Sequence, residues 1–389
     1  MQKFDLQKFE KKIFLPFERN ILNFTYQFSK ELREHKNFKK YIELHFLSLW
    51  CSKNNIEKFY IKENENLYKI GRGLVFHISP KNIPLNFIYS FFLGLLSGNS
   101  NIVKLPNGNF EETEVVLDVV KKLFNNKNFK FLKNSNFFLK LSHDSKEIED
   151  ITKISDARMI WGGDSTIEFY KKINTPIRCL DLVFSDRYSF SIINSKKFQE
   201  LNINKKKELA KKFFVDTMLT DQNACNSPHT VFWIGKIKRQ IKNVFWTELL
   251  NIIKEKYKID DIQIFDKYNT LSTFLATNKF IKNFKNYENY LYLIEVKNNV
   301  NNIEKLRGIN GMFFEIELSN IKSLSKFVSE KCQTITSFGH GNKEIFEIIK
   351  KNNLKGIDQI CDFGKAMQFS NVWDGYNVIE SLTRSINIK

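Results

Sequence analysis

The 389-residue sequence has few cysteines and no spacing that would join them. The five are Cys51, Cys179, Cys225, Cys332 and Cys361, and no two of them form a CxxC pair. This odd, widely spaced set argues against a disulfide framework and against a structural zinc site, so we expect no metal. Free thiols fit a reducing compartment, and the sequence therefore predicts a cytoplasmic protein.

Long apolar runs are also missing. The most apolar stretch, 83–98, contains Asn86 and is shorter than the roughly 20 residues that a membrane-spanning helix needs. The N-terminus, MQKFDLQKFEKKIF, is charged and lacks the apolar run and cleavage site of a signal peptide. We therefore expect a buried helix at 83–98, no export signal and no integral membrane segment.

Positive charge is abundant instead, with a formal net charge of +18. Such a charge suggests a polyanionic partner, and a nucleic-acid-binding protein is one alternative, which salt-sensitive DNA binding would reveal. However, the basic residues are scattered, and the abundant Lys, Asn, Ile and Phe all have A/T-rich codons. We therefore expect no nucleic-acid partner, while anionic small molecules such as coenzyme A or nicotinamide phosphates remain compatible with the charge.

From residue 73 onward, short apolar runs alternate with longer amphipathic patterns, which is typical of βαβ units around a parallel sheet. Helices are expected at 84–96 and 111–124, and strands at 73–78, 101–105, 137–141, 157–161 and 188–193. This half is typical of a nucleotide-binding sheet. A helix at 205–219 then leads through a polar loop to a strand at 229–234, where a second α/β unit begins.

These patterns predict four parts of the chain. They are an N-terminal segment at 1–70 that packs on the cofactor domain, a cofactor-binding domain at 71–205, a catalytic domain at 206–350 and a C-terminal return segment at 351–389. No Pro- or Ser-rich linker marks the boundary near residue 205.

Cys225 lies in the polar loop between the expected helix and strand, and Asn226-Ser227-Pro228 follow it. A turn here should expose the thiol, as a nucleophile requires. The alternative is a small buried apolar side chain, which is the usual role of a free cysteine and the one expected for the other four. His229 follows at the start of the strand, where it either lowers the thiol pKa or points elsewhere.

Other polar residues are expected where strands end, and ligands bind at the carboxyl edge of open α/β sheets. Asn82 lies in a loop between prolines after the strand at 73–78, where its amide could donate to an oxyanion or cap a helix. Lys104 ends the next strand, facing either a phosphate or ribose group or only solvent. The turn at 161–166, WGGDST, has paired glycines that let a backbone approach a phosphate.

Seven segments, in this order, resemble the LuxC-type long-chain acyl-CoA reductases, a branch of the aldehyde dehydrogenase superfamily. The resemblance spans roughly residue 70 to the C-terminus. The segments are HISPKNIP around Asn82, LLSGNSNIVKLP around Lys104, WGGDST from Trp161, FSDRYSFSII from Phe184, DQNACNSP around Cys225, KCQTITSFG from Lys331 and NVWDGYNVIESLTR near the C-terminus.

The resemblance implies an aldehyde-dehydrogenase-like α/β fold, with a Rossmann-type cofactor-binding domain and an α/β catalytic domain. Cys225 matches the nucleophile and Asn82 the asparagine of the oxyanion hole. The residues implied to bind the nicotinamide cofactor are Ser79, Pro80, Lys104, Gly162, Gly163 and Ser165.

Two departures from the superfamily pattern bear on the reaction. Gln222 stands three residues before Cys225 rather than two, and the Glu-Leu-Gly-Gly segment that holds the general base is not reproduced, with Asp181 as its nearest acidic neighbour. Loss of the base suits thioester reduction, because a reductase must exclude water rather than activate it. Asn107 stands where NAD-preferring members often have an acidic residue, which favours NADPH over NADH.

The predicted function is therefore NADPH-dependent reduction of an acyl thioester, carried by coenzyme A or by a protein, to the aldehyde through an acyl-cysteine. The alternative is a non-acylating aldehyde dehydrogenase that oxidises an aldehyde to an acid. The resemblance also implies a homo-oligomer and a partner protein that transfers acyl groups. Nothing in the residues indicates the acyl chain length.

Overall fold

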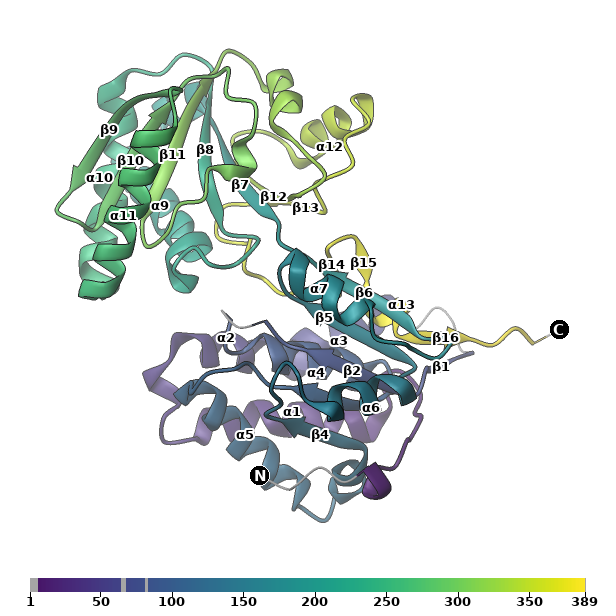
Figure 1. Cartoon of the computed structure of the whole chain (residues 1–389). Helices are drawn as coiled ribbons and strands as arrows, with labels where there is room; N and C mark the ends of the chain where they lie inside the picture. Colours follow the sequence, from purple (N-terminus) through teal and green to yellow (C-terminus); the bar gives the residue numbers. More distant parts are fainter. Residues whose placement is uncertain (1–5, 64–67, 81–82, 389) are drawn as a thin grey trace. The chain divides into compact units, whose positions relative to one another are not determined.

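The computed structural model of the chain describes residues 6–63, 68–80 and 83–388. The chain forms two compact units (Figure 1). The first comprises Met1–Ser185 and Phe369–Lys389, and the second comprises Asp186–Gln368.

The first unit contains a five-stranded parallel sheet with the order β4-β3-β2-β5-β6. Counted from its first strand, this is the 3-2-1-4-5 order of a mononucleotide-binding sheet. The strands are β2 (Leu74–Ile78), β3 (Ser100–Lys104), β4 (Asn136–Leu139), β5 (Ala157–Trp161) and β6 (Leu180–Phe184).

Helices cover both faces of this sheet. One face packs on α4 (Asn86–Leu96) and α5 (Glu111–Phe124), and the other on α6 (Lys146–Ile154) and α7 (Asp164–Lys171). Side chains of β2 alternate between the two cores, with Val75 on the α4 side. Because both faces are buried, apolar side chains point to both faces of β2, as expected for a parallel sheet.

Both ends of the chain belong to the first unit. The N-terminal helices α1 (Arg19–Glu34) and α2 (Ile42–Trp50) share the core of α4 and α5. Strand β1 (Lys69–Gly71) pairs antiparallel with β16 (Thr383–Ser385). The remaining elements are α3 (Lys53–Glu63), β14 (Val372–Trp373), β15 (Tyr376–Asn377), α13 (Val378–Ser381) and the 3-10 turns η1 (Leu6–Lys8), η2 (Phe38–Lys40) and η3 (Lys130–Ser135).

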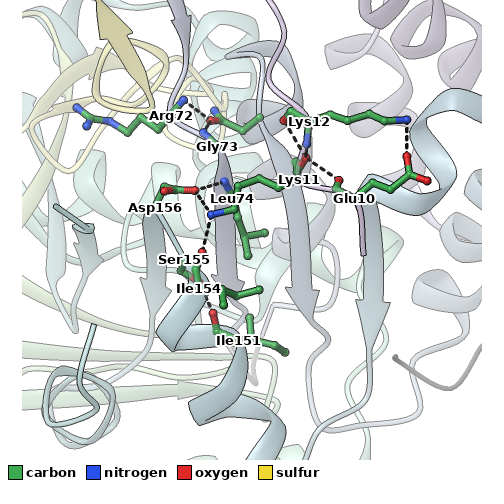
Figure 2. Close-up of polar contacts among 12 residues, drawn as sticks. Glu10, Lys11, Lys12, Arg72, Gly73, Leu74, Ile151, Ile154, Ser155 and Asp156 are labelled. Atoms are coloured by element: carbon green, nitrogen blue, oxygen red, sulfur yellow. Dashed lines mark hydrogen bonds and ion pairs between the residues drawn. The ribbon is translucent and has the colours of Figure 1, made fainter. Parts of the chain in front are cut away.

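The segment at residues 10–12 contacts the amino end of the first sheet (Figure 2). The Lys11 ammonium lies 2.8 Å from an Asp156 carboxylate oxygen, which also accepts the N–H of Leu74 at 2.7 Å. Gly73 is required beside them, because a Cβ there would lie 2.2 Å from the carboxylate and its φ is +136°. These bonds set where β2 begins, and its other end leads into Ser79.

The second unit contains a seven-stranded sheet with the order β13-β12-β7-β8-β11-β10-β9, parallel except for β9. Helices α9 and α10 cover one face, and α11 and α12 cover the other. The strands are β7 (Tyr188–Asn194), β8 (Pro228–Ile234), β9 (Ile281–Tyr287), β10 (Leu291–Val296), β11 (Met312–Leu318), β12 (Cys332–Phe338) and β13 (Gln359–Asp362). The helices are α8 (Ser195–Glu200), α9 (Ile203–Thr217), α10 (Arg239–Lys256), α11 (Asp261–Thr277) and α12 (Asn342–Lys351), with the 3-10 turns η4 (Met218–Thr220), η5 (Ile303–Lys305) and η6 (Ile321–Phe327).

Most of the predicted elements are confirmed. The bounds of α5 and β5 are as predicted, and those of β2, β3, β4, β8, α4 and α9 agree to within two residues. The stretch at 83–98 forms the buried helix α4, and none of the helices in the described ranges has the length and apolar character of a membrane span.

Two strands differ from the prediction. The strand at 188–193 forms, as β7, but it pairs with β8 and β12 in the second sheet rather than joining the first. The edge strand β6 was not predicted, because Asp181 interrupts its short apolar run. A strand's own residues set its burial but not its partners, which depend on the path of the whole chain.

A buried carboxylate joins β11 to the helix that covers it. Glu315 accepts the indole N–H groups of Trp233, at 2.8 Å, and Trp246, at 2.6 Å, and lies 3.5 Å from the ammonium of Lys242. Burial raises the pKa of Glu315, while Lys242 and the two indoles favour its charged form. Removing this side chain would leave the two buried indole N–H groups without their acceptor and would take one of two carboxylates from Lys242.

We therefore expect Glu315→Ala to lower the free energy of unfolding by about 3–5 kcal/mol, the usual cost of breaking a buried charged cluster. Glu317→Ala is the matched control, because Glu317 also pairs with Lys242 but is half-exposed, and it should cost about 1 kcal/mol or less. Urea unfolding followed by tryptophan fluorescence measures both. Equal midpoints for the two variants would contradict the prediction.

Candidate active site

Cys225 lies in the loop that joins η4 to β8, at the amino end of the central strand β8. It is half-buried, as is Cys179, whereas Cys51, Cys332 and Cys361 are buried. Burial raises the pKa of the Cys179 thiol to about 11 and that of Cys361 to about 12. The loop position predicted for Cys225 is confirmed, and the buried thiols have the inert setting of structural cysteines.

Gln222 fixes the loop to the neighbouring strand. Its side-chain oxygen accepts the N–H groups of Gly311, at 2.8 Å, and Met312, at 3.2 Å, and its amide nitrogen donates to the Met312 carbonyl at 3.1 Å. The side chain is buried, and the backbone is left-handed at Asp221 and Gln222, with φ of 52° and 60°. Gln222 thus pairs with the start of β11 as another strand would.

Two further strands hold the backbone of Cys225 itself. The Ser189 hydroxyl, on β7, donates to the Cys225 carbonyl at 2.6 Å and accepts the N–H of Thr334, on β12, at 3.1 Å. On the other side of Cys225, the N–H of Ser227 donates to the Ala224 carbonyl at 2.9 Å. The peptide groups around the thiol are therefore oriented by β7, β12 and their own turn.

His229 does not activate the thiol by its charge. It is buried, and its Nδ1 donates to the Gly308 carbonyl at 2.9 Å. Burial, together with the nearby Arg307, lowers the pKa of His229 to about 3. A neutral imidazole supplies no positive charge to a neighbouring thiol. Of the two alternatives for His229, the structure therefore supports the one in which the side chain points elsewhere, and the histidine anchors the turn at Gly308.

In the first unit, Ser79 and Lys104 lie at the carboxyl ends of the adjacent strands β2 and β3, as predicted. The Ser79 N–H donates to the Lys104 carbonyl at 3.3 Å, so the two residues are neighbours. The Ser79 hydroxyl is buried and has no hydrogen-bond partner within the described ranges. Pro80 follows, and Asn82 lies outside the described residues. A buried hydroxyl at this edge is suited to a ligand's polar group.

The Lys104 side chain is buried except for 6% of its surface. Its ammonium lies 3.5 Å from the side-chain oxygen of Asn107, on the exposed loop that follows β3. A cation held at a strand's carboxyl end suits a phosphate or ribose group. Asn107 itself carries no charge, so this contact is a hydrogen bond rather than an ion pair.

The turn after β5 leads directly into α7. Gly163 is the residue that precedes the helix, and a Cβ on it would meet nothing within 4 Å, whereas one on Gly162 would lie 2.9 Å from the Thr166 side chain. Ser165 is exposed in the first helical turn. Open space beside Gly163 permits close approach of a ligand to the helix N-terminus, although Asp164 places a negative charge there.

Asp181 is engaged elsewhere. Its two carboxylate oxygens accept from the Arg158 guanidinium, from Nε at 2.7 Å and from Nη2 at 2.6 Å, across the paired strands β5 and β6. Arg158 is buried and also donates to the Tyr170 carbonyl. Both oxygens of this carboxylate are therefore occupied by the guanidinium. This contact argues against Asp181 as a general base.

His77 is a structural histidine in the first sheet. Because Asn101 donates both amide hydrogens, to the Asn99 carbonyl and to Asn136, its oxygen accepts from His77 Nε2 at 2.9 Å. His77 Nδ1 then accepts from Ser90 at 2.8 Å. Burial lowers the pKa of His77 to about 4. Across the described residues, no group of three or more His, Cys, Asp or Glu is placed to hold a metal ion.

Comparisons with known proteins agree with this architecture. A family model described as acyl-CoA reductase (LuxC) matches residues 17–385. No curated protein matches the chain in sequence.

Several solved structures are similar in fold. Betaine aldehyde dehydrogenase from Staphylococcus aureus has 12% identity and a TM-score of 0.66, over 95% of this chain and 82% of that one. GapN, a glyceraldehyde-3-phosphate dehydrogenase from Methanocaldococcus jannaschii complexed with NADP, has 11% identity and a TM-score of 0.63, over 94% and 88%. Lactaldehyde dehydrogenase from Escherichia coli has 10% identity and a TM-score of 0.63, over 96% and 86%. The predicted aldehyde-dehydrogenase fold is thereby confirmed.

The cysteine environments predict the order in which the thiols react. At pH 8 a thiol with a pKa of about 11 is ionised roughly two hundred times less than an ordinary thiol. We therefore expect iodoacetamide to label Cys225 first, Cys179 much more slowly, and the three buried cysteines only after unfolding. Peptide mass spectrometry over time measures the order, with Cys225→Ser and Cys179→Ser as a matched pair. Labelling of Cys179 first would refute the prediction.

Proposed function

Because the chain belongs to the acyl-CoA reductase (LuxC) family, we propose that it reduces a fatty acyl thioester to the aldehyde with NADPH, through an acyl-cysteine on Cys225. The observation that carries the proposal is the half-buried thiol on a loop whose backbone Gln222 and Ser189 hold in place. A fixed, reachable thiol is what nucleophilic catalysis requires.

In the proposed first step, the Cys225 thiolate attacks the thioester carbonyl and the carrier's thiolate leaves, so one thioester replaces another. The developing oxyanion needs donors at the attacked carbon. We assign these to the Cys225 backbone N–H, whose direction the surrounding turn sets, and to the Asn82 amide. The role of Asn82 is a prediction from its sequence segment alone.

The acyl-cysteine must then survive until it is reduced. The nicotinamide cofactor, when bound, supplies the hydride that reduces it. Collapse of the resulting thiohemiacetal on Cys225 releases the aldehyde and restores the thiolate. Hydrolysis is the competing reaction, and we propose that it is disfavoured because the segment that holds the superfamily's general base is not reproduced in this sequence. Asp181, the nearest acidic neighbour of that position, is engaged by Arg158.

The residues at the carboxyl edge of the first sheet fit a nicotinamide cofactor. The Ser79 hydroxyl, which has no partner among the described residues, and the Lys104 ammonium would hold its polar groups, and the open backbone at Gly163 would lie against its phosphates. We propose that Pro80, Gly162 and Ser165 line the same site.

Other parts of the proposal follow from family resemblance alone. They are fatty acyl chains of the long-chain type, a donor bound to coenzyme A or to an acyl-transferring partner protein, a homo-oligomeric assembly and a cytoplasmic location.

Intact-protein mass spectrometry with acyl-CoAs of several chain lengths tests the proposal. We expect wild type to gain one acyl group and to lose it as aldehyde when NADPH is added. Cys225→Ala should gain none and lose all turnover, whereas Cys179→Ala should behave as wild type. No adduct with any acyl-CoA or acyl-protein, together with acid formation from aldehyde and NAD without coenzyme A, would contradict the proposal.

The uncharged side chain of Asn107 leads to a separate prediction about the preference for NADPH over NADH. Asn107→Asp should place a negative charge beside Lys104 and near a bound 2′-phosphate, so the ratio of kcat/KM for NADPH to that for NADH should fall by about tenfold. Asn109→Asp, on the same exposed loop, is the matched control. An unchanged ratio in Asn107→Asp would show that Asn107 does not face the ribose.

A further inference from the structure

A buried carboxylate lies close to the nucleophile loop in the chain, and the proposed mechanism does not use it. Asp216, in the last turn of α9, is fully buried. One of its oxygens accepts the Gly364 N–H at 2.6 Å, and the other accepts the Ala366 N–H at 2.9 Å. Asp216 therefore holds a turn at 364–366 against α9.

The same turn contacts the nucleophile loop through its other polar group. The carbonyl of Ala366 accepts a hydrogen bond from the side-chain amide of Asn226, which directly follows Cys225 and is 3% exposed. The hydroxyl oxygen of the next residue, Ser227, lies 4.0 Å from the sulfur of Met367. A continuous series of bonds thus runs from Asp216 through the backbone of residue 366 to the residue after the nucleophile.

A purely structural role for Asp216 is the simplest alternative. The turn is already held by packing, since the Phe363 ring lies 5.6 Å from that of Phe213 on α9. A buried charge is a costly way to satisfy two N–H groups. Asp216 differs from a general stabilising contact in one respect. It binds the N–H of Ala366, and the carbonyl of the same residue accepts the hydrogen bond from Asn226 in the nucleophile loop.

We infer that Asp216 is a positioning residue: its carboxylate holds the 364–366 turn where the Ala366 carbonyl anchors Asn226, and so orients the backbone at Cys225. This inference rests on the proposed function, because Asp216 would affect the rate by orienting the Cys225 N–H, which the proposal assigns as a donor to the oxyanion. Displacement of reacting groups by about 1 Å can cost a hundredfold in rate.

The ionisation of Asp216 adds a dependence on pH. Burial raises the pKa of Asp216 to about 7, against the two backbone N–H groups that favour its charged form. The titratable group on this segment that interacts with Asp216 is Cys361, whose thiol pKa burial raises to about 12, while Asp362 and Lys365 are exposed and pair with each other. A protonated carboxyl accepts one N–H fewer, so the anchor should loosen as the pH falls through about 7.

The test compares Asp216→Asn with Asp362→Asn, a control on the same segment whose carboxylate is exposed and pairs only with Lys365 among the described residues. Asp216→Asn should lower kcat with acyl-CoA by about ten- to a hundredfold, while KM for NADPH changes less than twofold. Wild type should show a step near pH 7 in the rate of Cys225 alkylation by iodoacetamide, and Asp216→Asn should lose that step. Asp362→Asn should match wild type in all three measurements.

Asn226→Ala removes the other end of the link and guards against a folding defect in the first variant. We expect the same loss of kcat, and a double variant no worse than either single one, because both changes break one series of bonds. Wild-type kcat and alkylation profile in Asp216→Asn, or additive losses in the double variant, would overturn the inference. Failure of wild type to form an acyl adduct would instead refute the proposed function, and the alkylation profile would still report on Asp216.

Discussion

The hydrogen bonds between Gln222 and the backbone at 311–312 are the constraint on which the proposed chemistry depends. A nucleophilic thiol must be reachable, yet a loop exposed enough to admit a substrate is ordinarily too mobile to orient one. By pairing with β11 as a strand does, the Gln222 amide gives the loop the rigidity of the sheet. The Ser189 hydroxyl and the Ser227 N–H then hold the peptide groups on either side of Cys225, and the Asn226 side chain binds the Ala366 carbonyl.

The two sheets contribute different edges to this chemistry. Ser79 and Lys104 follow the ordinary rule for open α/β sheets and lie where parallel strands end. Cys225 lies instead where β8 begins, so its position comes from the loop that precedes the strand. In the first sheet, the Arg158–Asp181 ion pair joins β5 to β6 and engages both oxygens of that carboxylate.

Buried polar groups divide into two kinds. The imidazoles of His77 and His229 and the carboxylate of Glu315 are fully engaged with neighbours and serve the fold. The hydroxyl of Ser79 lacks a partner in the described part of the chain, and the carboxylate of Asp216 carries its effect to the residue beside Cys225. Unsatisfied or costly buried groups are retained where they serve a site, which is why these two carry the functional argument.

The sequence by itself determined most of the helices and strands between residues 73 and 234, the turn at Cys225 and the family segments, because burial periodicity and turn signals depend on residues that are neighbours in the chain. It predicted Ser79 and Lys104 at strand ends for the same reason. Only the tertiary structure decided that β7 joins the second sheet, that Arg158 engages Asp181, that His229 is neutral, and that Gln222 and Asp216 reach residues 311 and 364. These contacts join positions far apart in the chain, and no local pattern specifies which distant groups meet.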